Sequence, residues 1–475
     1  MNSSKNILFL QSILNVRGAV QSTDDVVQWL EERNRSVKVR IEPTRFSALR
    51  NWKFQPATGN LVHESGKFFS IEGVHVRTDW GALPTWKQPV INQPEIGFLG
   101  ALAKEIDGVL HFLMQAKIEP GNVNNVQLSP TLQATRSNYT QVHKGAKPLY
   151  LDYFLSCRPA DVLLDQLQSE QGARFLRKRN RNIIVKTTDD PPIDENFRWL
   201  TLGQIIELMH RDNTVNMDAR TVVSGIPFGD YSSAVVELSS SMSQGGIHTD
   251  LLHSALDHES ALHSIDDILS WLARLKSTYF LDVKPIGLNE IEDWSVTDEK
   301  IHHVEDRFFS ILPVEVEIEN REVATWAQPL LCPAQEGICA FVIKKINGLY
   351  HFLVQAKLEC GNHDVFELAP TVQCLTGNYR TAASQKLPFL EYVLKAPKNR
   401  IIYEALQSEE GGRFYHEQNR NMIVTAPASF AEQHPDNYLW MSLNQMKTFL
   451  KFNNYLNIQA RSLIAAIQFS TKAPA

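Results

Sequence analysis

Two mainly apolar runs, residues 97–106 and 109–118, follow each other closely and predict two β-strands. The residues between them are Asp107 and Gly108, and an Asp-Gly pair between two such runs predicts a β-hairpin. Residues 22–30 begin with hydroxyl and carboxyl side chains and continue with apolar residues at helical spacing. This pattern predicts a helix that is capped at its N-terminus.

The same patterns occur a second time in the chain. Residues 108–139 align with residues 348–379 without a gap, at a shift of 240, and 16 of the 32 positions are identical. Residues 166–185, for which we expect a helix leading into a strand, match residues 405–424 at 12 of 20 positions. Because solenoid repeats span only roughly 20–50 residues, a repeat at this spacing indicates duplicated domains.

The sequence therefore predicts an α+β protein built of two tandem domains that arose by internal duplication. We expect the first repeat at residues 1–238, a linker at residues 239–260 and the second repeat at residues 261–475. The linker is rich in serine and glycine, and we expect its His248, His253 and His258 on the surface of a loosely ordered segment.

Several polar residues keep their identity in both copies. Gln115, Lys117 and Glu119 lie two apart on a predicted strand and therefore share one face. In a single copy, a Lys–Glu pair on a solvated sheet face would be the simpler interpretation, contributing roughly 0.2–1 kcal/mol. Because the same row recurs in the second copy, we interpret it as a ligand-binding face beside the loop at Asn122.

The second repeated block carries arginines in both copies. Arg174 and Arg181 are kept, and guanidinium groups suit phosphate recognition. The first copy has three further basic residues here, Arg177, Lys178 and Arg179, whereas the second copy has no lysine or arginine at the matching positions. A solvated charged face and a loop that binds a diphosphate explain this difference equally well.

Composition narrows the range of functions. The net charge of −6 argues against non-specific nucleic-acid binding, and no apolar run approaches the roughly 18–20 residues of a membrane span. Five cysteines without a CxxC pair are typical of a reduced cytoplasmic protein, and we expect no metal site. Since no GxGxxG, Walker loop, HExxH or GxSxG motif occurs, we expect side-chain acid–base chemistry without a cofactor.

The motifs in residues 115–139 and 166–182, together with the duplication, resemble the NDP-hexose 2,3-dehydratase family over nearly the whole chain. The resemblance implies two tandem Nudix-like α/β/α domains and a homodimer without catalytic metal. It also implies removal of the 2-hydroxyl from a dTDP-4-keto-6-deoxy sugar, which leaves a 3,4-diketo-2,6-dideoxy sugar. One pocket of each subunit would be active, and the other would be a relic of the duplication.

The resemblance also implies roles for individual residues. The base that removes the carbon-3 proton would be Glu119 or Tyr139, and the acid that protonates the leaving hydroxyl would be Lys117 or His143. The side chains expected to bind the substrate or polarise its ketone are Trp86, Gln115, Asn122, Gln133, Arg136, Asn138, Arg174, Arg179 and Arg181. Those expected in the second pocket are Lys357, Glu359, Gln373, Asn378, Tyr379, Arg413 and Arg420.

The second copy has a threonine in place of Arg136 and no counterpart of His143, so we expect the working pocket to consist mainly of first-copy residues. Two other functions stay open: a metal-dependent Nudix-type hydrolase of nucleotide sugars, and a non-catalytic nucleotide-sugar-binding protein. A Nudix hydrolase holds Mg²⁺ with a glutamate-rich helix, and residues 128–139 and 368–379 contain no carboxylate. That difference argues against the hydrolase.

Overall fold

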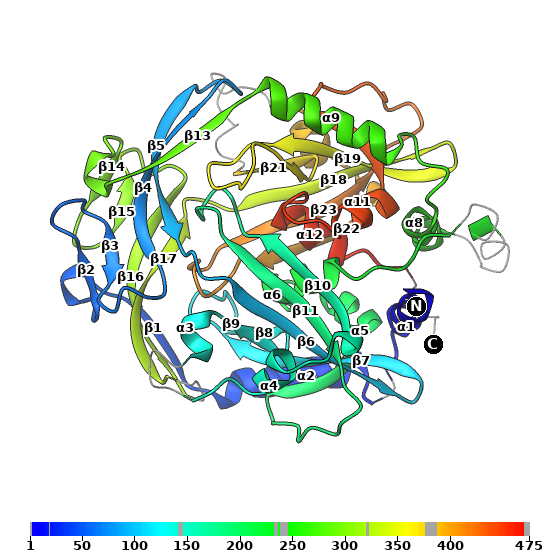
Figure 1. The fold of residues 1–475 in the computed structure, drawn as a ribbon, viewed down its shortest axis with the longest axis horizontal. Helices are drawn as coiled ribbons and strands as arrows, with labels where there is room; N and C mark the ends of the chain where they lie inside the picture. Colours follow the sequence, from blue (N-terminus) through cyan, green and yellow to red (C-terminus); the bar gives the residue numbers. More distant parts are fainter. Residues whose placement is uncertain are drawn as a thin grey trace.

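The computed structural model describes residues 2–18, 20–140, 146–231, 236–237, 246–319, 323–375 and 387–469. No helix within these ranges is long and apolar enough to cross a membrane. Helices and strands are mixed throughout both halves (Figure 1), and the predicted α+β class is confirmed.

The helices and strands of the first half follow in this order: α1 (Asn2–Leu14), α2 (Thr23–Ser36), β1 (Val39–Pro43), β2 (Trp52–Phe54), β3 (Leu61–His63), β4 (Ser70–Thr78), β5 (Thr85–Asn92), β6 (Gly97–Ile106), β7 (Val109–Ile118), β8 (Val126–Ser129), β9 (Leu132–Ala134), α3 (Arg136–Tyr139), α4 (Leu151–Leu155), β10 (Val162–Ser169), β11 (Arg179–Lys186), β12 (Phe197–Thr201), α5 (Leu202–Leu208) and α6 (Met217–Ser224).

The second half repeats nearly the same order: α8 (Ile247–Leu256), α9 (Ile265–Thr278), β13 (Leu281–Ile286), β14 (Trp294–Val296), β15 (Ile301–His303), β16 (Phe309–Ile318), β17 (Thr325–Pro333), β18 (Gly337–Ile346), β19 (Leu349–Lys357), β20 (Glu367–Ala369), β21 (Val372–Leu375), α10 (Leu390–Leu394), β22 (Ile401–Ser408), β23 (Gln418–Thr425), β24 (Tyr438–Ser442), α11 (Leu443–Phe449) and α12 (Ile458–Ala465).

Each half contains one seven-stranded sheet, and the two sheets have the same topology. The first runs β10-β11-β6-β7-β12, with β8 beside β7 and β9 beside β6; the second runs β22-β23-β18-β19-β24, with β20 and β21 in the matching places. The predicted hairpin is the β6–β7 pair, and its turn residues Asp107 and Gly108 have φ of 49° and 75°. Positive φ at both positions is what an Asp-Gly hairpin turn requires.

Local signals explain several other elements. Helix α2 begins after Ser22, whose side chain accepts from Asp25 N while the Asp25 carboxylate accepts from Ser22 N, and Ser264 and Asp267 repeat this capping box at α9. The expected helix-to-strand passage over residues 166–185 is wrong. These residues form most of the antiparallel β10–β11 pair and its connecting loop, because Leu164, Ile183 and neighbouring apolar residues pack into the sheet core.

The two halves exchange strands in their N-terminal parts. Strand β1 of the first half pairs antiparallel with β16 of the second, and β13 of the second half pairs with β4 of the first (Figure 1). The resulting five-stranded sheets enclose a shared apolar core that includes Trp52, Phe69, Trp294 and Phe309. Each N-terminal sheet therefore contains strands from both repeats.

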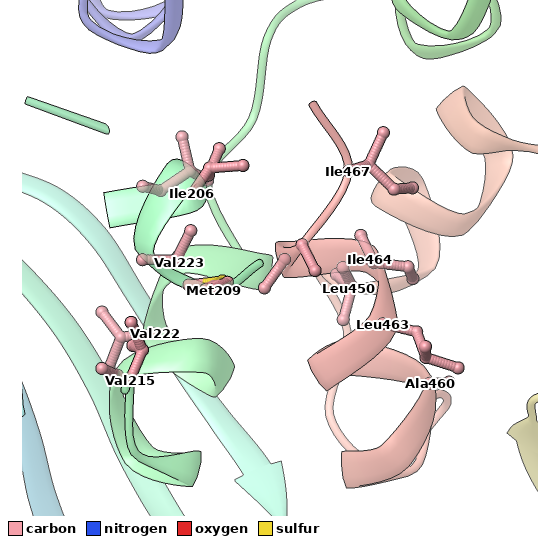
Figure 2. Packing of buried hydrophobic residues seen from close by; sticks show 14 of the residues in the cluster. Ile206, Met209, Val215, Val222, Val223, Leu450, Ala460, Leu463, Ile464 and Ile467 are labelled. Atoms are coloured by element: carbon pink, nitrogen blue, oxygen red, sulfur yellow. The ribbon is translucent and has the colours of Figure 1, made fainter. Parts of the chain in front are cut away.

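Helices α6 and α12 pack against each other between the two central sheets. Figure 2 shows apolar side chains of the two repeats at this contact, among them Met209 and Val223 on one side and Leu450 and Ile464 on the other. The motif Asn213-x-x-Asn216-x-x-x-Arg220 recurs as Asn454-x-x-Asn457-x-x-x-Arg461, and its arginine is buried at this contact in both repeats. Arg220 Nε donates to Ser462 Oγ at 2.7 Å, and Arg461 Nε donates to Thr221 Oγ1 at 2.8 Å. This motif therefore joins the repeats.

Helix α8 lies within the segment that we predicted as a linker. Its Ser254 Oγ donates to Tyr350 O at 2.6 Å, just as Ser12 Oγ of α1 donates to Leu110 O at 2.5 Å. The expectation of a loosely ordered segment is therefore wrong for this helix, because its apolar side packs on the second repeat in the way that α1 packs on the first. Residues 239–245 lie outside the described ranges, and the exact domain boundaries stay a prediction.

Candidate functional site

A cavity of about 970 Å³ lies between the two repeats. The first repeat lines it with Lys117, Glu119 and Gln133, and the second repeat contributes Trp326 and Arg413. A space of this size accommodates a nucleotide sugar, since ligand pockets usually measure roughly 300–1,000 Å³. We refer to Lys117, Glu119 and Gln133 as the first cluster.

The first cluster is held together by hydrogen bonds at the end of β7. Gln133 Nε2 donates to Glu119 Oε1 at 2.7 Å, and Lys117 Nζ donates to the Gln133 backbone carbonyl at 3.2 Å. Asn216 Nδ2 in turn donates to Gln133 Oε1 at 3.1 Å, which fixes the orientation of that amide. Glu119 is only 5% exposed, and its Oε2 has no hydrogen-bond partner among the described residues. This oxygen is available to accept a proton.

The second repeat lines the cavity with residues of β17 and of the loop between β22 and β23. Gln328 Nε2 donates to Gly412 O at 2.8 Å, and Trp326 Nε1 donates to Gln328 Oε1 at 2.9 Å. The Arg413 guanidinium lies 4.3 Å from the centre of the Phe69 ring. The second repeat thus adds a fixed positive charge and an indole to the cavity of the first cluster.

Two repeated glycines allow the repeats to approach each other at this point. Gly121 N donates to Gly411 O at 2.7 Å, and a Cβ on Gly121 would overlap the backbone oxygen of Phe414. Gly361 makes the matching contact with the backbone of the first repeat near Phe175. Only glycine fits so close to a neighbouring carbonyl, which explains why both copies keep it.

An aromatic group lines part of the cavity. The centre of the Trp52 ring lies 5.3 Å from that of the His63 imidazole and 4.8 Å from that of Phe69, and the Phe68 ring lies 4.8 Å from His63. Burial lowers the pKa of His63 below its usual value, against the attraction of Glu64. A neutral imidazole among aromatic rings suits the binding of a planar, uncharged group such as a nucleobase.

Two carboxyl groups that line the cavity, those of Asp218 and Glu410, have raised pKa values. Burial, followed by the neighbouring Glu410 and Glu170, raises the pKa of Asp218 well above its ordinary range. Burial also raises the pKa of Glu410 to about 7, against the attraction of Arg413. The pKa of Lys178 is lowered by burial, although Glu170 and Glu410 oppose that change. Of these groups, Glu410 is able to exchange protons near neutral pH.

The segment after β9 was expected to supply several site residues. Arg136 is exposed, and the Tyr139 ring lies 5.7 Å from Phe98, which lines the cavity. Tyr139 is therefore one side chain away from the cavity. Asn138 belongs to α3, but its side chain is outside the described part of the chain, and His143 lies outside the described residues altogether.

Four other predicted residues lie outside the cavity lining. Arg181 makes two hydrogen bonds of 2.7 Å with the Asp165 carboxylate on the neighbouring strand. Asn122 is buried and donates to the backbone carbonyl three residues further on, which stabilises its own turn. Gln115 lies within β7, and Arg179 lies at the start of β11. The contacts of Arg181 and Asn122 stabilise the sheet and a turn.

Lys357, Glu359 and Gln373 form the matching second cluster in the second repeat. Gln373 Nε2 donates to Glu359 Oε1 at 3.1 Å, and Lys357 Nζ approaches the Gln373 carbonyl at 3.5 Å. Burial raises the pKa of Glu359, although Lys357 and Arg174 attract its charged form. Arg420, also predicted here, instead pairs with Glu404 on the neighbouring strand at 2.6 Å.

Two residues that we expected in the first pocket lie with the second cluster. Arg174 reaches the Glu359 region with its guanidinium 4.3 Å from the Phe309 ring, and Trp86 packs against the apolar group that contains Cys360. Arg413, which we expected in the second pocket, lines the cavity of the first cluster. The assignments are exchanged because the loop that carries Arg174 or Arg413 in one repeat meets the chain just after β19 or β7 of the other repeat. Asn378 and Tyr379 lie outside the described residues.

Sequence reasoning missed Asp218 and Glu410. Both line the cavity, and Asp218 Oδ1 is buried without a hydrogen-bond partner among the described residues. A signal for both was present in the repeat, because the second copy has Gln459 at the position of Asp218 and the first copy has Gln171 at the position of Glu410. A carboxyl and an amide have nearly the same size and shape, but only the carboxyl can gain or lose a proton, so these two positions differ between the copies in acid–base chemistry.

The fold and the cavity define a duplicated α+β protein whose pocket is equipped for acid–base chemistry. Within the described residues, no group of three or more His, Cys, Asp or Glu residues is arranged to hold a metal ion. The family model described as NDP-hexose 2,3-dehydratase matches residues 23–226 and 265–467, one match for each repeat. The chain belongs to this family.

Curated relatives cover almost the whole chain. A protein of Saccharopolyspora spinosa is 44% identical over 98% of this chain and 96% of its own length. Proteins of Amycolatopsis orientalis and Streptomyces violaceoruber are 43% and 41% identical over 96% and 93% of this chain, and over 92% and 96% of their own lengths. All three are named dTDP-4-dehydro-6-deoxy-alpha-D-glucopyranose 2,3-dehydratase.

Proposed function

We propose that the protein is a carbon–oxygen lyase that removes the 2-hydroxyl of a dTDP-linked 4-keto-6-deoxy hexose, in deoxysugar biosynthesis. The observation that carries this proposal is a cavity that joins a buried, half-partnered carboxylate, Glu119, to a lysine and to carboxyls with raised pKa. The names and full-length similarity of the relatives supply the substrate class.

The chemistry needs a base, an acid and a group that stabilises an enolate. The ketone at carbon 4 acidifies the hydrogen on carbon 3, and its removal moves an electron pair toward oxygen 4. When the carbon-4 ketone re-forms, the 2-hydroxyl leaves and a double bond joins carbons 2 and 3. The resulting enol then tautomerises to the 3,4-diketone. Positioned acids and bases typically contribute about 10²–10⁴-fold to such steps.

We assign the base to Glu119, because its Oε2 is buried and accepts no hydrogen bond from the described residues while Gln133 orients the other oxygen. Lys117 lies beside Gln133 and would stabilise the negative charge that develops on oxygen 4. Tyr139, one side chain away, stays a prediction as an alternative base, and His143 stays a prediction as a proton donor.

Substrate binding is assigned to neighbouring groups that line the cavity. Arg413 of the second repeat would bind the diphosphate, since a guanidinium forms bidentate contacts with phosphate oxygens. The aromatic group around Trp52, together with Trp326, would contact thymine. These assignments leave the sugar beside the first cluster.

The test is incubation of the purified protein with dTDP-4-keto-6-deoxyglucose, followed by mass spectrometry of the products. We expect a product lighter by one water, with the diphosphate intact. Release of nucleoside monophosphate would instead show a Nudix-type hydrolase, and unchanged substrate in the presence of measurable binding would show a non-catalytic binding protein. Because no step of the proposal uses a metal or a cofactor, we expect activity to survive EDTA and dialysis.

We further propose that the protein is a homodimer of two Nudix-like repeats per subunit and works in the cytoplasm. Support for the dimer and the Nudix-like relationship comes from the family resemblance of the sequence. All five cysteines are free, which fits a reducing compartment. Light scattering of the purified protein measures the oligomeric state, and a mass equal to one chain would contradict the dimer.

A further inference from the structure

Glu410 comes from the second repeat but lies beside the base of the first. A methyl group built on Gly412 would lie 3.2 Å from Glu410 Oε1 and 3.5 Å from Glu119 Oε1. Both carboxyls therefore flank the same glycine, and both line the cavity. Glu119 is oriented by an amide, whereas Glu410 is partly exposed to the cavity and faces Arg413.

The second cluster keeps the lysine, the glutamate and the glutamine of the first, but it has no carboxyl at the position of Glu410. Gln171 stands at the position of Glu410 and donates a hydrogen bond to Glu409, and Ala173 stands at the position of Gly412. A primary amide cannot release a proton to a departing hydroxyl, and the alanine methyl occupies the space that the glycine leaves open. The second cluster therefore has a candidate base, Glu359, but an amide at the position of Glu410.

We propose that Glu410 is the general acid of the reaction, supplied by the second repeat to a base of the first; this inference rests on the proposed dehydratase function. Glu119 takes the carbon-3 proton. As the enolate collapses, the bond from carbon 2 to oxygen breaks and Glu410 donates its proton, so that the oxygen leaves as water. In the tautomerisation, Glu119 returns its proton to carbon 2 and Glu410 takes the proton of the 3-hydroxyl.

The protonation states fit these roles. Burial together with Glu170 and Glu119 raises the pKa of Glu410 to about 7, while Arg413 and Lys178 oppose the rise, so the acid is about half protonated at neutral pH. Asp218 adds to this local crowding of carboxyls, and its counterpart in the second repeat is the neutral Gln459. An acid whose pKa lies near the working pH is the most efficient proton donor.

The experiment compares two leaving groups in Glu410→Gln, a change that the fold tolerates at the matching position in the second repeat. The substrates are dTDP-4-keto-6-deoxyglucose and its 2-deoxy-2-fluoro analogue, because fluoride leaves without being protonated. We expect water elimination to fall about 10²–10³-fold while fluoride elimination stays within about tenfold of the wild-type rate. Glu119→Gln should lose both reactions, and the exposed Glu31→Gln on α2 should lose neither.

If Glu410→Gln eliminates water at the wild-type rate, or if water and fluoride elimination fall together, Glu410 is not the acid. Glu410→Asp, which keeps a carboxyl, should recover part of the water elimination, and no recovery above Glu410→Gln would also contradict the role. A wild-type protein that yields no dehydrated product from the natural substrate would overturn the proposed function itself. The two failures are thus distinguishable.

Discussion

The two clusters of this protein share their frame and differ in their acids. In each, a glutamine orients a buried glutamate, and an arginine of the other repeat stacks on a phenylalanine at 4.3 Å. Around the first cluster, however, stand Asp218, Glu410 and Lys178, whereas the second has Gln459, Gln171 and Glu417. The comparison shows that hydrogen bonds which hold a site together survive duplication even when the neighbouring ionisable groups differ.

The largest expected difference is between the two glutamates. Glu119→Gln removes the base and should reduce turnover about 10²–10⁴-fold, whereas Glu359→Gln should stay within about twofold of the wild type. Steady-state kinetics with the nucleotide sugar measures both variants. Equal losses would show that the second cluster also takes part in turnover, and the comparison would have to be abandoned.

The two stacked arginines should also differ, by a smaller factor. Arg413→Ala removes the positive charge that faces the cavity of the first cluster, so we expect kcat/KM to fall about 10–100-fold, mainly through KM. Arg174→Ala alters the second cluster and should change kcat/KM by less than about threefold. A larger loss in Arg174→Ala would support the original sequence-based assignment of Arg174 to the active pocket.

Glu410 should cost stability as well as serve catalysis. Its pKa is raised by burial to about 7, from an ordinary value near 4.5, so the folded state binds more protons and stability falls as the pH rises between these values. Glu410→Gln should therefore unfold about 1–2 °C higher than the wild type at pH 8. The gain should vanish near pH 4.5. Thermal scans by circular dichroism test this, and a variant less stable at pH 8 would oppose it.

The smallest expected effect concerns stability at Lys447, a buried lysine where the first repeat has Ile206 at the matching position. Lys447 Nζ is buried and donates to Ser224 O at 3.0 Å and Ile226 O at 3.1 Å, and burial lowers its pKa to about 7. The unfolded chain binds more protons between pH 7 and the ordinary value of 10.5, so this lysine destabilises the fold most at and below pH 7.

We expect Lys447→Met to raise the unfolding temperature by about 1 °C at pH 6.5 and by less at pH 9.5. The matched control is Lys451→Met, because Lys451 lies on the surface near Asp230 and should change the temperature little at either pH. A destabilised Lys447→Met would show that the two carbonyl contacts outweigh the burial of the charge.

Much of the fold follows from local signals in the sequence. The Asp107–Gly108 turn and the Ser22 cap are decided by neighbours a few residues away, and the structure has both as predicted. The exchange of β1 and β13 between the halves was not predictable, because partners such as Val39 and Ile318 lie far apart in the chain and each strand pattern fits several edges.

Only part of the candidate site was predicted from the sequence. Lys117, Glu119 and Gln133 stood out because both copies keep them, and the structure brings them together. Identity between copies gave no information about which repeat's arginine faces which cluster. A search for residues that both copies keep also leaves out Glu410, because the first copy has Gln171 at that position.

The most direct test is a crystal structure of Glu119→Gln soaked with dTDP-4-keto-6-deoxyglucose. We expect the sugar in the cavity between the repeats, with carbon 3 beside residue 119 and the 2-hydroxyl within about 2.6–3.2 Å of a Glu410 oxygen. A sugar bound beside Glu359, or one whose 2-hydroxyl faces away from Glu410, would contradict a pocket whose base and acid come from different repeats.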